Sequence, residues 1–151
     1  MKSTTIVELM VGTGLLIGAG MAVAFVWMLF YVSEPPVSYS GNHRVIPPVV
    51  MPGGIIEIDR TIHVHRKTML TIYRTAHTIK DGHVYMYDLP NAISNKPPGD
   101  YRQLRATQLP DDMIEGDYRL QTHVCWKENL FKEACVDAPD VHFRVSRDAS
   151  A

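Results

Sequence analysis

The sequence predicts an all-β domain that follows a single membrane-spanning helix. Residues 9–32 contain no charged side chain, whereas the chain after them is polar and of mixed charge. In that later part apolar residues alternate with polar ones, which is the period of strands with one buried face. Pro, Gly and Asp separate these segments at short intervals, as turns do in all-β domains.

The charge-free segment, LMVGTGLLIGAGMAVAFVWMLFYV, is long enough to cross a bilayer. As a helix it would measure about 36 Å, against about 30 Å for the hydrocarbon core. Trp27 and Tyr31 lie near its end, where aromatic side chains meet the headgroups. Residues 22–24, Ala-Val-Ala, offer a signal-peptidase site, but cleavage there would leave FVWMLFYV exposed. We therefore predict an uncleaved signal-anchor helix over residues 9–32, after a short cytoplasmic tail over residues 1–8.

Charge and cysteine content indicate how the chain is oriented. Lys2 and the N-terminal amine favour a cytoplasmic N-terminus, with Glu34 beyond the far end of the helix. Two cysteines, Cys125 and Cys135, are typical of one disulfide in an oxidising compartment. The chain has no Asn-x-Ser/Thr acceptor, which favours a bacterial periplasm over a secretory lumen. We expect a single-pass protein whose C-terminal domain is periplasmic or extracellular.

A spacer and a β domain are predicted to follow the helix. The prolines at positions 35 and 36 stop the helix, and residues 33–42 are expected to be an extended spacer. The β domain is expected over residues 43–147, with a disordered tail over 148–151. Prolines 47 and 48 confine the first apolar segment of this domain to a sheet edge or a kink.

About seven strands are predicted in the β domain, which is the expectation for an Ig-like antiparallel β-sandwich. Asp81-Gly82 predicts a type I′ hairpin. Arg60 and Arg74 fall on otherwise apolar faces, which indicates that the strand registers assumed in this prediction are shifted by one residue. The clearest buried faces are predicted to consist of Ile56, Ile58, Ile62 and Val64; of Tyr118, Leu120, Thr122, Val124 and Trp126; and of Val141, Phe143 and Val145.

The segment IEGDYRLQTHVCW carries two structural predictions. Gly116 supplies backbone freedom where the chain crosses between sheets, and Tyr118 caps that crossing with its hydroxyl as a tyrosine corner. A bond between Cys125 and Cys135 would close a loop of about 11 residues, which contributes roughly 2.5–3 kcal/mol by loop-closure entropy.

The sequence resembles a loose group of uncharacterised single-pass membrane proteins of tailed phages and bacteria. The resemblance rests on VVMPGG, IYRTAHTIKDGHVY and LPDDMIEGDYRL, and on Cys125 near the end of the next strand. It implies an N-terminal anchor and an Ig-like ectodomain, with no activity to transfer. In that group a further cysteine often follows the basic residues of the second strand. His65, Arg66 and Lys67 stand there instead, so a disulfide to that strand is not expected.

Histidine offers the one candidate metal site. His63 and His65 alternate on one strand and face the same way, a spacing that can chelate copper or zinc. The alternative is that they are ordinary polar residues of an exposed sheet face. No third ligand is placed by the sequence, so we expect no cofactor.

The helix offers a candidate packing face. Gly14 and Gly18 form a Gly-xxx-Gly pair that Ala22 continues by one turn, which suits close approach of a second helix. The alternative is that small residues are simply common in membrane helices.

Composition and motifs narrow the function. The net charge is -1 and no Lys/Arg cluster occurs, so a nucleic-acid partner is not expected. No catalytic motif is recognisable, so we expect no enzyme activity. The leading hypothesis is a membrane-anchored Ig-like module that binds or scaffolds an envelope or virion protein. The alternatives are a periplasmic copper or zinc protein and an accessory subunit recruited through its helix, by self-association or within a larger complex.

Overall fold

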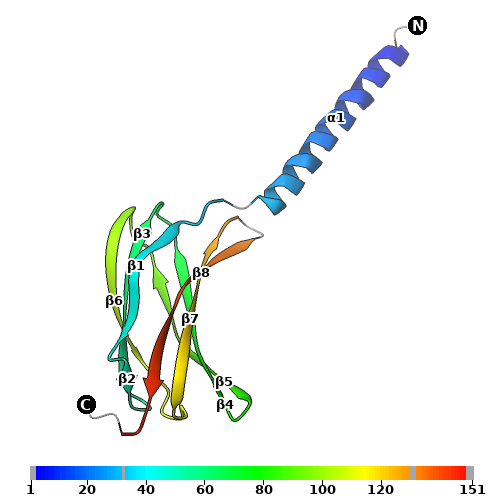
Figure 1. The fold of residues 1–151 in the computed structure, drawn as a ribbon. Coiled ribbons are helices and arrows are strands. Elements are labelled where there is room, and N and C mark those ends of the chain that lie inside the picture. Colours follow the sequence, from blue (N-terminus) through cyan, green and yellow to red (C-terminus); the bar gives the residue numbers. More distant parts are fainter. Residues whose placement is uncertain (1–2, 32, 130–131, 149–151) are drawn as a thin grey trace. The chain divides into compact units, whose positions relative to one another are not determined.

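The computed structural model describes residues 3–31, 33–129 and 132–148, with side chains from residue 12 onward. The chain divides into two compact units, residues 1–33 with 128–132 and residues 34–127 with 133–151. Within the described residues, one helix and eight strands form (Figure 1). They are α1 (Ser3–Phe30), β1 (Val37–Ile46), β2 (Val49–Val50), β3 (Ile55–Val64), β4 (Leu70–Lys80), β5 (His83–Ser94), β6 (Gly99–Gln108), β7 (Gly116–Lys127) and β8 (Glu133–Val145).

Helix α1 has the length and composition of a membrane-spanning helix. Its segment Gly12–Phe30 is apolar and none of it is buried. The rings of Trp27 and Tyr31 stack near its end, with centroids 4.6 Å apart. The helix begins at Ser3, earlier than predicted, because no Gly or Pro interrupts the sequence between Ser3 and Met10. Most of the predicted tail is therefore helical.

The eight strands form the predicted Ig-like β-sandwich. One sheet has three strands in the order β1-β3-β6, and the other has five in the order β2-β8-β7-β4-β5. Among the described pairs, only β2 and β8 run parallel. The segment around Pro47-Pro48 supplies the eighth strand, because the chain leaves the smaller sheet after β1 and joins the larger one as β2. Prolines lack the N–H that a continuous ladder requires, so the strand divides there.

The predicted spacer is too long at its C-terminal end. Strand β1 begins at Val37, which pairs with Val64 and is 3% exposed. Gly41, with a φ of 74°, lies in a register shift between Ser40 and Arg44. This irregularity lets one strand continue through residues whose polarity alone suggests a loop.

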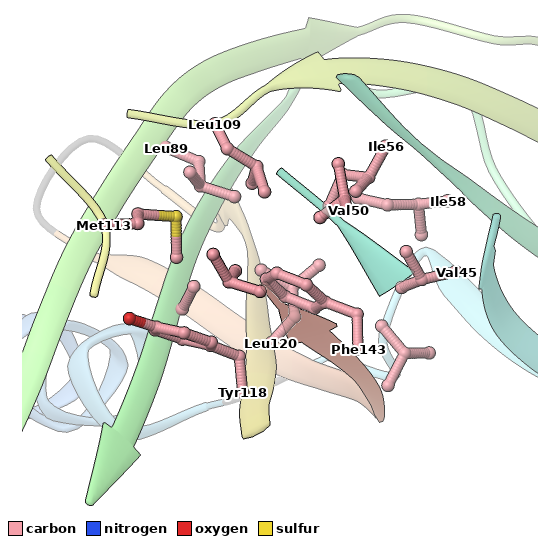
Figure 2. Close-up of a cluster of buried hydrophobic side chains, with 13 residues drawn as sticks. Val45, Val50, Ile56, Ile58, Leu89, Leu109, Met113, Tyr118, Leu120 and Phe143 are labelled. Atoms are coloured by element: carbon pink, nitrogen blue, oxygen red, sulfur yellow. The ribbon is translucent and has the colours of Figure 1, made fainter. Parts of the chain in front are cut away.

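The inward faces form two apolar clusters. Both Leu120 and Ile56 are fully buried, although they come from different sheets, and Trp126 is 2% exposed. Figure 2 shows the first cluster, in which Tyr118 and Phe143 stack with centroids 5.4 Å apart. It comprises Val45, Val50, Ile56, Ile58, Ala76, Leu89, Leu109, Met113, Tyr118, Leu120, Val141, Phe143 and Val145. The second comprises Val37, Ile62, Val64, Leu70, Val124, Trp126 and Ala134.

The expected slip of register is wrong, because the two arginines are truly buried. Arg60 and Arg74 are 5% and 4% exposed and point inward with their apolar neighbours. Thr122, which pairs with Arg74, is also buried. One of these three residues lies on each of the strands β3, β4 and β7. Along its strand it lies between side chains of the first cluster and side chains that belong to the second cluster or pack against it. We call Arg60, Arg74 and Thr122 the polar layer.

Candidate binding surface

Strand β5 is an open edge of the five-stranded sheet. It pairs with β4 over Leu70–Lys80 and ends the order of strands. Between His83 and Leu89 the only formally charged residue is Asp88. We call residues 83–89 the β5 edge. Over these seven residues the strand has one charge, Asp88, and no proline or register shift, both of which come only after Leu89, so its backbone groups are open to another strand.

Apolar side chains surround the β5 edge on its outer face. Ala76 and Thr78 are buried, so the intervening His77 and Ile79 point outward. Ile79 pairs with Val84, and His77 pairs with Met86. Ile79, Val84 and Met86 are 72%, 61% and 68% exposed. We call these three residues the hairpin patch. Contiguous exposed apolar surface of this kind marks an interaction site more often than single exposed residues do.

The turn that joins β4 to β5 has the predicted type I′ geometry. Asp81 and Gly82 both have positive φ, 52° and 76°. This turn matches the twist of the flanking strands and fixes their register. The hairpin is therefore a defined surface rather than a loop with many conformations.

The inner side of the hairpin is held by the start of β7. The Thr78 hydroxyl donates to the Asp117 carbonyl at 2.6 Å. A Cβ at Gly116 would lie 3.2 Å from that hydroxyl oxygen, so a side chain there would crowd the contact. Gly116 has no positive φ, which corrects the predicted role: its small size rather than its backbone freedom is used.

Tyr118 has the geometry expected of a tyrosine corner. Its hydroxyl donates to the Ile114 carbonyl at 2.8 Å, four residues earlier. Burial raises the pKa of this hydroxyl above its ordinary value, so it stays a donor. The corner fixes the segment that supports the hairpin.

An open groove of about 610 Å³ lies beside the hairpin patch. His77, Arg119 and His142 form a row across β4, β7 and β8 in this groove. Arg119 is ion-paired with Asp140. A partner that covers the hairpin patch would therefore also contact the polar side chains of the adjacent groove.

The other three sheet edges are blocked. Strand β2 has two residues and covers only the end of β8, whose remaining free side carries Asp137, Pro139 and Asp140. Strand β1 is interrupted by its register shift. Strand β6 carries charged residues along its length, among them Asp100, Arg102 and Arg105. Charges and irregularities of this kind are how sheet edges avoid pairing with other chains.

The structure joins Cys125 and Cys135 in a disulfide. They are direct partners on the adjacent strands β7 and β8. The bond therefore staples one hairpin of the five-stranded sheet and does not link the two sheets.

The two predicted metal ligands lie side by side, but one ring nitrogen of each is engaged in a hydrogen bond with another residue. The His63 and His65 rings meet edge to face, with centroids 4.6 Å apart. His63 Nδ1 is hydrogen-bonded to Asp100, and His65 Nε2 lies 2.9 Å from the Ser38 hydroxyl. Among the described residues, no group of three or more His, Cys, Asp or Glu side chains is arranged to hold a metal ion.

The predicted helix-packing residues Gly14, Gly18 and Ala22 are exposed. A Cβ built at Gly14 or Gly18 would meet no atom within 4 Å, and Ala22 is exposed. A partner helix for this face stays a prediction.

Sequence reasoning missed the β5 edge. The signal was present in HVYMYDL, a strand-like run with one charge directly after the Asp-Gly turn. Which strands end a sheet depends on long-range pairing, so this run did not stand out from the paired strands.

Comparison with solved structures finds several of low similarity. The chain is 13% identical to the Pseudomonas fluorescens alkylpurine DNA glycosylase AlkC bound to DNA containing an abasic site analog, over 76% of this chain and 31% of that one, with a TM-score of 0.48. It is 8% identical to the sporulation control protein Spo0M of Bacillus subtilis, over 74% of this chain and 50% of that one, with a TM-score of 0.45. It is 14% identical to PapD-like domain 7 of human CEP192, over 78% of this chain and 92% of that one, with a TM-score of 0.45.

The chain spans 31% and 50% of the length of the first two of these chains. No protein-family model and no curated protein sequence matches it. None of these similarities is close enough to transfer a function.

Proposed function

We propose that this chain is a membrane-anchored, non-enzymatic binding module whose Ig-like domain takes up an extended segment of a partner protein at the β5 edge. The observation that carries the proposal is the contrast among the four sheet edges. Three are short, irregular or charged, whereas β5 offers a regular run over residues 83–89, before its own register shift, with exposed apolar neighbours.

Strand addition explains both features of this edge. A peptide that adds to β5 gains main-chain hydrogen bonds, each contributing about 0.5–1.5 kcal/mol net. Its alternate side chains cover Val84 and Met86, and full burial of such a side chain contributes about 1.5–3 kcal/mol. The expected partner segment is therefore extended, about five residues long, and apolar at alternate positions.

The helix supports the membrane part of the proposal. α1 is apolar over Gly12–Phe30, and the domain that follows it contains a disulfide, which suits an oxidising compartment. With Lys2 on the cytoplasmic side, the domain faces the periplasm or the exterior. The partner is then another envelope protein or the exposed part of one.

The test is site-specific photo-crosslinking in native membranes. A photoreactive residue is placed in turn at positions 83–88 of the full-length protein, and at Leu104 of β6 as the control. Leu104 is 56% exposed on the edge of the other sheet. We expect one partner to be captured from the β5 positions, with yields that alternate from one residue to the next.

Two results would contradict strand addition. Equal capture from Leu104 would show that the β5 edge is not selective. Capture that is uniform along 83–88 would indicate a contact without strand pairing. Capture that requires only the helix, and survives removal of the domain, would support the accessory-subunit alternative instead.

A further inference from the structure

The polar layer borders a small cavity between the two sheets. Its volume is about 30 Å³, which is room for about two water molecules. Side chains from both sheets line it. The polar ones are Tyr39, Arg60, Arg74, Gln103, Arg105 and Thr122.

The two buried arginines each cross the sandwich with the tips of their side chains. Arg60, on the three-stranded sheet, donates from Nη2 to the Pro139 carbonyl of β8 at 3.3 Å. Arg74, on the five-stranded sheet, donates from Nη1 to the Thr107 hydroxyl of β6 and from Nη2 to the Pro90 carbonyl. Both guanidinium groups are thus fixed in place by neutral acceptors.

Three buried polar atoms of the polar layer have no partner among the described residues. They are Nε of Arg60, Nε of Arg74 and the hydroxyl oxygen of Thr122. The residues that carry them are at least 95% buried, with exposed fractions of 5%, 4% and 2%. Each of these atoms carries a hydrogen to donate. Buried donors that lack an acceptor are rare in folded proteins, so this set points to a ligand that accepts hydrogen bonds.

The charge around the cavity has the same sign throughout. The lining contains three arginines and, among the described residues, no carboxylate. Asp140 acts on Arg60 from a distance but is itself ion-paired with Arg119. Burial, followed by the nearby positive charges of Arg105 and Arg60, lowers the pKa of Arg74 to about 10. A buried charge requires a compensating one.

We propose that this cavity binds one small monovalent anion of the size of chloride, held by the Nε–H groups of Arg60 and Arg74 and by the Thr122 hydroxyl. The cavity is too small for a phosphate ester or a nucleotide. The residues that carry these donors lie on β3, β4 and β7 and line the same cavity, so the anion joins the two sheets where the apolar core divides. It is an integral part of the fold and is separate from the β5 edge.

The first test is thermal unfolding of the full-length protein in detergent. Sodium chloride is replaced stepwise by sodium gluconate at constant ionic strength. A ligand that binds only the folded state raises the midpoint of unfolding in a saturable way. We expect such a rise with chloride, and also with bromide, at millimolar concentration. Equal midpoints in chloride and gluconate would overturn the proposal and leave water in the cavity.

A matched pair of variants locates the site. Thr122→Val removes one donor and keeps the shape of the side chain; it is expected to weaken chloride binding about tenfold. Arg144→Gln removes an arginine whose side chain is 63% exposed and lies 3.9 Å from Asp117, so it should leave the chloride response unchanged. An unchanged response in Thr122→Val, or the loss of it in Arg144→Gln, would place the anion elsewhere.

Line broadening in chlorine NMR gives a readout that does not depend on stability. Broadening is expected with the wild-type protein and should decrease with bromide added as a competitor. Arg74→Met, which removes a donor and its charge, should abolish the broadening in any fraction that folds. Narrow lines with the folded wild-type protein would contradict the site.

Discussion

The two sheets of the sandwich use their outer faces differently. On the three-stranded sheet Asp59 lies between two arginines, 3.2 Å from Arg44 Nε and 2.9 Å from both Arg102 Nε and Nη2. These bonds tie all three strands together. On the five-stranded sheet the ion pairs Arg119–Asp140 and His123–Asp137 lie on β7 and β8, whereas the hairpin patch on β4 and β5 is apolar and exposed. The ion network of the three-stranded sheet thus spans every strand, whereas the five-stranded sheet leaves its β4–β5 end available to a partner.

The inner faces show no such difference. Ile56 on the three-stranded sheet and Leu120 on the five-stranded sheet are both fully buried in the first cluster. The polar layer likewise draws residues from both sheets. The asymmetry of this domain therefore lies in its outer faces and edges, and experiments that compare matched residues can test it.

The largest expected effect is the loss of core volume. Leu120→Ala and Ile56→Ala should each lower the free energy of unfolding by about 2–5 kcal/mol, because each leaves a cavity in a packed cluster. Chemical denaturation of the full-length protein measures both. Similar losses would support equal inner faces; a loss below about 1 kcal/mol at either position would show that its sheet packs loosely.

The next effect belongs to the five-stranded sheet alone. Replacing Cys125 and Cys135 together by Ser should lower the free energy of unfolding by roughly 2.5–3 kcal/mol, from the loop entropy that the bond removes. Thermal unfolding with and without reductant measures this loss in the wild-type protein. Reductant should not affect the double variant, and any remaining effect would have another cause.

The sequence predicted the features that depend on local pattern. The alternation from Tyr118 to Trp126 and the Asp81-Gly82 turn follow from side-chain period and backbone preference, and both occur in the structure. The proline pair at 47–48 predicted an interrupted strand. It did not predict that the two halves join different sheets, because that depends on which strands lie nearby.

Long-range partners explain the failures. The pattern predicts Arg60 and Arg74 to be out of register because an arginine is rarely buried unless it is paired. Their acceptors are Pro139, Thr107 and Pro90, all distant in sequence. The sequence places Val37 in a spacer because its partner, Val64, lies in another strand. The β5 edge was missed for the same reason, since being an edge is a property of the whole sheet.

The ion network of the three-stranded sheet should make stability depend on pH. The hydrogen bond from Arg102, followed by that from Arg44, lowers the pKa of Asp59 from 3.8 to about 2 in the folded protein. The stabilisation is thus complete above the unfolded value and is lost as pH falls from about 4 through 2. Asp59→Asn should reduce the midpoint of unfolding at neutral pH and flatten its decline over this window. An equally steep decline in the variant would assign the acid sensitivity to other groups.

The smallest effect on stability should accompany the clearest effect on binding. Val84→Lys and Leu104→Lys each add a charge at an exposed position, 61% and 56% accessible, so each should change the free energy of unfolding by less than about 0.5 kcal/mol. Only Val84→Lys places that charge in the hairpin patch, where an added strand would have to cover it. Capture of the partner should therefore fall with Val84→Lys and persist with Leu104→Lys. If both variants capture equally well, the open edge is not the contact surface; if both fail, the outer faces of the two sheets are not functionally distinct.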